Sequence, residues 1–141
     1  MAISDNITNR LVRLEGAFGR VFESAMDWAE QDFQSEIAEN KWPWPNKTIR
    51  QNGQPVESPR NIIDTGNLLQ SQSRESLGVN HTAFTWTGQS GSTKTYALYV
   101  HDGCVLKNGG RIPARAFTNH AIQKLPDIVG ALIAKEVASN G

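Results

Sequence analysis

The chain has 141 residues, a length that favours a single domain with a modest core. Its 14 Lys and Arg residues balance 14 Asp and Glu residues, which argues against a general nucleic-acid-binding surface, because that requires a basic excess. Charged residues near the start and the lack of a run of about 20 apolar residues exclude a signal peptide and a membrane span, so we expect a soluble protein made in the cytoplasm.

Apolar residues at three- and four-residue spacing predict a long N-terminal helix. This stripe runs from Leu11 to Ile37, and Pro43 follows it. About 35 helical residues would be about 50 Å long, nearly twice the reach of a domain of this size. We therefore expect either a break near Trp28 or a projecting end that packs on a neighbouring subunit.

The same segment has six acidic residues and no basic residue between Arg20 and Lys41. Such a face is usually solvated. It is also suited to a basic partner, or to a channel through which DNA slides without binding.

Trp42-Pro43-Trp44-Pro45 comes next and predicts extended backbone with both indoles turned outward. Two readings follow: a loop folded onto its own core, or an anchor in a subunit interface. Asn52-Gly53 then predicts a hairpin over 48–56, with Pro55 on an edge strand. Residues 43–60 form the expected long loop.

The middle of the chain shows short elements. Asp64-Thr65-Gly66-Asn67 is expected to open a short helix, with Asp64 as its cap and Leu68 and Leu69 at the start of its apolar face. Further elements are predicted as follows: paired strands at 75–79 and 81–87, and a short helix from Tyr96 to Val100 with Gly103 as its stop.

A second hairpin is expected around Asn108-Gly109, between strands at 105–106 and 111–112. A closing helix follows from Ala121 to Val137, with Pro126 predicted to kink it or to start a second segment. The fold class is therefore α+β, one domain over 1–141, with a small antiparallel sheet of hairpins backed by the N-terminal and C-terminal helices.

The chemistry-bearing residues do not form a familiar catalytic motif. Ile62-Ile63-Asp64-Thr65-Gly66 is similar to an aspartic-protease turn, but such a site needs two aspartates, so the helix cap is the preferred reading. The three histidines have no metal-ligand spacing, and we expect no metal and no cofactor. A small hydrolase based on Asp64 or on His101, which Asp102 would orient, is the enzyme alternative.

Three further motifs occur in order along the chain. They are Asp64-Thr65-Gly66 with Leu68 and Ser71; Tyr96-Ala97 with Val100, His101 and Gly103; and Ile112-Pro113-Ala114-Arg115 with Phe117. Together they resemble the head–tail joining proteins of long-tailed bacteriophages, the neck, tail-completion and tail-terminator proteins. Ala116 departs from that pattern, which usually has a proline there, but Arg115 and Phe117 remain in place.

The resemblance implies a structural virion protein of the neck, and not an enzyme. It implies a sixfold homo-oligomeric ring that contacts connector or stopper proteins on the head side and the tail tube protein on the other. DNA would pass through the lumen without specific binding. Candidate interface residues are Trp42, Trp44, Arg115 and Phe117. For Arg115 and Phe117 a fold-stabilising role is an equal alternative. Motif residues expected to support the fold are Asp64, Gly66, Leu68, Tyr96, His101, Gly103 and Pro113.

Two roles within this class, tail terminator and separate tail-completion protein, both fit these motifs. A different class, a host-directed binding module that uses the loop around Trp42 and Trp44, is the third alternative.

Overall fold

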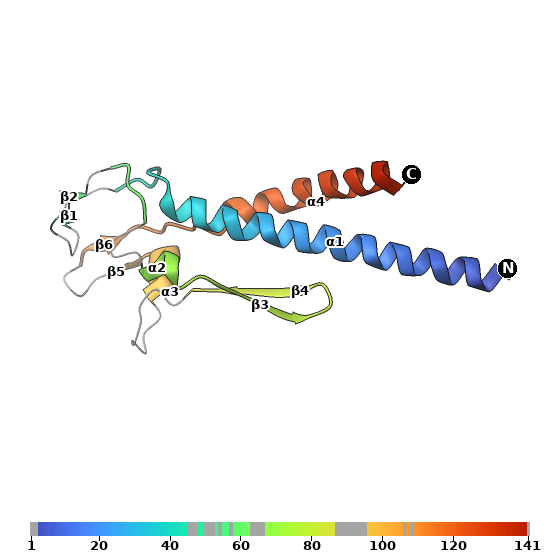
Figure 1. Cartoon of the computed structure of the whole chain (residues 1–141). Helices are drawn as coiled ribbons and strands as arrows, with labels where there is room; N and C mark the ends of the chain where they lie inside the picture. Colours follow the sequence, from blue (N-terminus) through green and yellow to red (C-terminus); the bar gives the residue numbers. More distant parts are fainter. Residues whose placement is uncertain are drawn as a thin grey trace.

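A computed structural model describes residues 3–44, 48–49, 53, 55–56, 58–62, 67–86, 96–105, 107 and 109–140. The elements in chain order are α1 (Ile3–Ala38), β1 (Thr48–Ile49), β2 (Pro55–Val56), α2 (Asn67–Gln70), β3 (Ser73–Gly78), β4 (His81–Thr85), α3 (Tyr96–Asp102), β5 (Cys104–Val105), β6 (Arg111–Ile112) and α4 (Asn119–Asn140). Figure 1 shows α1 and α4 as the two long elements, with the short ones gathered near one end of α1.

The α+β class is confirmed, with long helices at both ends and antiparallel strands between them. Within the described residues the strands form three separate two-stranded hairpins, β1–β2, β3–β4 and β5–β6, rather than one sheet. The β3–β4 hairpin is the longest, with Arg74 opposite Phe84. Hairpins this small bury little of their own surface, so they depend on packing against the helices.

Helix α1 is unbroken, so the break expected near Trp28 does not occur and one end projects instead. Its 36 residues make a rod of about 54 Å, whereas α4 has 22 residues and a length of about 33 Å. The two helices lie side by side and antiparallel, and the N-terminal end of α1 extends past the end of α4 (Figure 1). Small residues permit this approach, because Ala25, Ala29 and Ala121 are each almost fully buried.

The core lies at the C-terminal end of α1. One cluster of buried residues joins α1, α2 and α3 to the segment between β6 and α4. It consists of Ile37, Ile62, Leu68, Ala97, Val100 and Phe117. A second cluster, Ala29, Phe33 and Ala121, joins α1 to α4. Trp86 packs against both clusters and so connects them.

Several local predictions are confirmed. Helix α3 ends at Asp102, directly before Gly103, whose φ of 76° is the left-handed conformation that glycine adopts most easily. The expected β1–β2, β3–β4 and β5–β6 pairings are all present. Of the two alternatives for Pro126, a kink or the start of a second segment, the second segment is wrong, because α4 continues through this residue.

Two expectations have no outcome here: Asp64 and Gly66 lie outside the described residues. Among the described helices, none combines the length and the apolar content that crossing a lipid bilayer requires.

Candidate assembly interface

The segment that joins β6 to α4 carries the motif residues Pro113, Arg115 and Phe117, and it runs through the core. The amide of Arg115 donates to the carbonyl of Val100 at 3.0 Å, which fixes the segment against α3. Phe117 then enters the first core cluster with 2% of its surface exposed. Its ring meets those of Trp86 and His101 edge to face, each with a centroid separation of 5.2 Å.

The interface role expected for Arg115 and Phe117 is therefore wrong for this protomer. Both side chains are buried by their own chain, with 4% and 2% exposed, so they have almost no surface to offer a partner. Of the two roles that the sequence left open, the structure shows the fold-stabilising one. The motif organises the junction of α3, β6 and α4.

His101 is a member of the same junction. Its Nε2 lies 2.6 Å from the hydroxyl of Thr118, and its Nδ1 lies 2.7 Å from Oδ1 of Asp102. This chain of hydrogen bonds has the order of a hydroxyl, an imidazole and a carboxylate, as in acyl-transfer sites. However, the Asp102 side chain is 60% exposed, so its carboxylate is well solvated and holds the imidazole weakly. The contacts of His101 fit a residue that ties α3 to the start of α4.

The two tryptophans are held by contacts within the chain, which corrects the expectation that both turn outward. The Trp42 indole N–H donates to the carbonyl of Glu36 at 2.8 Å, and its ring packs against the first core cluster. Two guanidinium groups contact the Trp44 ring, those of Arg60 at 4.4 Å and Arg115 at 4.7 Å from the ring centroid. Both tryptophans remain half-buried rather than fully covered.

We predict that Trp42→Ala lowers the free energy of unfolding by about 2 kcal/mol, because it removes core contact and an indole hydrogen bond. Trp44→Ala should cost about 1 kcal/mol through the lost cation–π contacts. Chemical denaturation of the purified variants measures both, and Trp42→Phe isolates the hydrogen bond. Unchanged stability in both alanine variants would contradict this account and return the tryptophans to an interface role.

The acidic face of α1 has a basic partner inside the chain. Arg74, on β3, contacts carboxylate oxygens of Glu23 at 2.9 Å, Asp27 at 2.6 Å and Glu30 at 3.1 Å. The hydrogen bond with Asp27 is the main cause of a raised Arg74 pKa, and burial opposes it more weakly. These three acids hold the β3–β4 hairpin on α1 through Arg74.

A second polar cluster joins α1 to the first turn of α4. Nδ1 of His120 lies 2.7 Å from Oδ1 of Asp32 and 3.4 Å from Oε1 of Glu36, while Lys41 pairs with the other Glu36 oxygen. The side chains of Asp32, Glu36 and His120 could together hold a cation, since their ligand atoms lie within 4.8 Å of one another. Sequence spacing had no means to reveal the set, because His120 and Asp32 are 88 residues apart. The ion pair with Lys41 already compensates Glu36, so the cluster acts as a link between helices.

Among the described residues, the N-terminal half of α1 carries a row of apolar side chains that the protomer leaves exposed. Four apolar side chains there repeat at the spacing of the helix turn and are each 52–55% exposed: Ile7, Leu11, Leu14 and Phe18. We call these four residues the open stripe. Farther along, the same face carries Val21 and Ala25, which are buried. The face is thus continuous, but the chain covers only part of it.

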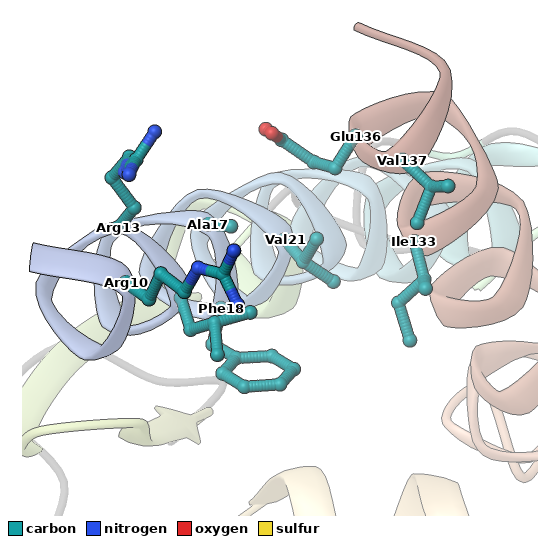
Figure 2. A pocket seen from close by; sticks show the side chains of 9 residues that line it. Arg10, Arg13, Ala17, Phe18, Val21, Ile133, Glu136 and Val137 are labelled. Atoms are coloured by element: carbon teal, nitrogen blue, oxygen red, sulfur yellow. The ribbon is translucent and has the colours of Figure 1, made fainter. Parts of the chain in front are cut away.

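The open stripe borders a groove of about 460 Å³ where α4 ends against α1. Apolar residues from both helices line it, including Ala17, Val21, Ile133 and Val137. Figure 2 shows Phe18 on α1 and Ile133 on α4 pointing toward the same side of the helix pair. An ion pair closes one edge, because Arg20 contacts both carboxylate oxygens of Glu136, at 2.9 and 3.1 Å. Exposed apolar surface of this extent is typical of a protein–protein contact.

Comparison with known proteins adds no relative: no family model, no curated protein and no solved structure matches this chain.

Proposed function

We propose that this chain is a structural subunit of the neck of a long-tailed bacteriophage, where copies of it form a ring that completes the tail and joins it to the DNA-filled head. The observation that carries the proposal is the open stripe with its groove. A domain of this size that leaves Leu11, Leu14 and Phe18 half-exposed on a projecting helix has apolar surface suited to assembly. The resemblance of the three sequence motifs to head–tail joining proteins is the reason for proposing the phage neck as the place of assembly.

The environment of the motif residues supports the same proposal. Leu68 and Phe117 belong to the core, and Gly103 lies against the strand that leads into Pro113. These residues therefore build a rigid base from which α1 projects. In the proposed ring, connector or stopper proteins contact one face and the tail tube protein the other, and DNA passes through the lumen.

The enzyme alternative has one observation in its favour, the hydrogen-bonded chain of Thr118, His101 and Asp102. The contact of the His101 ring with Phe117 favours a structural role for the imidazole at the core junction. The host-directed binding module loses its main support, because Trp42 and Trp44 both make contacts within the chain.

Electron microscopy of particles assembled without this protein tests the proposal. We expect DNA-filled heads and separate tails, whose length is normal or slightly irregular. Heads and tails should join again when the protein is supplied. Quantitative mass spectrometry of intact particles should give several copies per virion. Normal joined particles in its absence, or a single copy per virion, would contradict a ring-forming neck protein.

A further inference from the structure

The open stripe has the spacing of a helix–helix seam. The intervals from Ile7 to Leu11, Leu14 and Phe18 are four, three and four residues, which is the repeat that faces a second helix along a seam. Helix α4 covers the continuation of this face from Val21 onward, where the side chains become buried. A further helix that packs along the open stripe would therefore extend the apolar contact that α4 makes with α1 from Val21 onward.

The charges that flank the stripe indicate which helix fits. In a parallel coiled coil, the residue that directly precedes an a-position residue (heptad position g) lies next to the residue five positions later (heptad position e) on the neighbouring helix. Arg10 precedes Leu11, and Glu15 lies five residues after Arg10. The α1 helix of a second copy therefore brings an opposite charge next to each of these side chains.

Within the described residues neither charge is paired with an opposite charge, although Arg10 lies at the groove between α1 and α4. Arg10 and Glu15 are both exposed, and neither forms an ion pair with any residue in the described part of the structure. Five residues is also the wrong interval for a pair within one helix, which needs three or four. The opposite charges at this spacing are thus available to a neighbour and not to each other.

We infer that α1 helices of neighbouring copies pack parallel and in register along the open stripe, with Arg10 of one copy next to Glu15 of the next. This inference rests on the proposed function for the existence of a ring, and it assigns the contact that closes the ring. In a ring of more than two copies whose α1 helices run along the ring axis, rotation keeps every helix at the same height and with the same end up, so neighbouring helices are parallel. An antiparallel contact would give a closed dimer instead.

Charge reversal tests the inference with the full-length protein, measured by analytical ultracentrifugation at low salt. Arg10→Glu and Glu15→Arg should each weaken self-association about tenfold, since each replaces an attraction by a repulsion. The double variant, and an equimolar mixture of the two single variants, should both return to within about twofold of the parent. Added salt should reduce these differences.

Two serine variants test the seam. Leu14→Ser should abolish association at the concentrations where the parent assembles, while Val12→Ser should leave it unchanged. Val12 is the matched control, because it is 61% exposed on the same helix but lies off the stripe. Circular dichroism and thermal melting of the dilute protomers should be the same for both variants.

The outcomes separate this inference from the neck proposal. A double variant as weak as the single ones, equal effects of the two serine changes, or a parent that stays monomeric up to about 1 mM would each overturn the parallel contact. Those results leave the proposed function to the particle experiment. Normal joining of heads and tails without the protein would overturn the neck proposal, whatever the helices do in solution.

Discussion

Replacing Phe117 by alanine should lower the free energy of unfolding by about 3–5 kcal/mol, the range for an aromatic side chain lost from a well-packed core. Phe117 is 2% exposed and contacts the rings of both Trp86 and His101 edge to face. Trp86 in turn packs against both core clusters, so the cavity would open where the clusters meet. Equilibrium denaturation in urea measures the change.

Ile122→Ala is the matched control for this variant, because Ile122 lies five residues farther on but is 61% exposed. We expect it to change stability by less than about 0.5 kcal/mol. Phe117→Leu should fall between the two, since leucine refills part of the cavity. Similar losses for Phe117→Ala and Ile122→Ala would show that Phe117 is not at the centre of the core.

Gly103→Ala should be at least as damaging, and we expect it to prevent stable folding. Gly103 has a φ of 76°, and a Cβ atom there would lie 2.7 Å from the carbonyl oxygen of Ile112 and 2.8 Å from the amide nitrogen of Ala114. Both contacts are with backbone, which can move away only if β6 separates from the end of α3. Left-handed backbone adds about 1–2 kcal/mol of strain for alanine.

Gly109→Ala isolates the backbone contribution of this change. Its φ is 84°, but a Cβ atom added there would meet nothing within 4 Å. It should therefore lose only the conformational part, about 1–2 kcal/mol. Soluble yield and urea denaturation of the two variants give the comparison, and equal behaviour would contradict the close approach of β6 to Gly103.

Local signals in the sequence predicted much of the fold. Apolar spacing gave α1 and α4, because a helix places residues three and four apart on one face whatever lies beyond it. Gly103 and the alternation in β4 were equally local, since they reflect backbone freedom and strand geometry. The continuity of α1 past Trp28 was decided by packing, because α4 and the β3–β4 hairpin cover it there.

The side-chain partners were beyond sequence reasoning because they come from distant segments. Arg74 meets acids that lie 44 to 51 residues earlier, and His120 meets Asp32 across 88 residues. No periodicity relates such positions. The tryptophans illustrate the same point: a Trp-Pro-Trp-Pro segment looks exposed until the backbone of Arg60 pairs with that of Trp42 and places a guanidinium group against Trp44.

The unbroken length of α1 makes it a lever. Its C-terminal half is held by the core and by α4, while the N-terminal end of this rod, about 54 Å long, projects past α4 among the described residues (Figure 1). A rotation of about 5° at the anchored end would displace the free end by about 5 Å, close to one helical turn. Small rearrangements around the core of one subunit would thus be magnified where that subunit reaches toward the next.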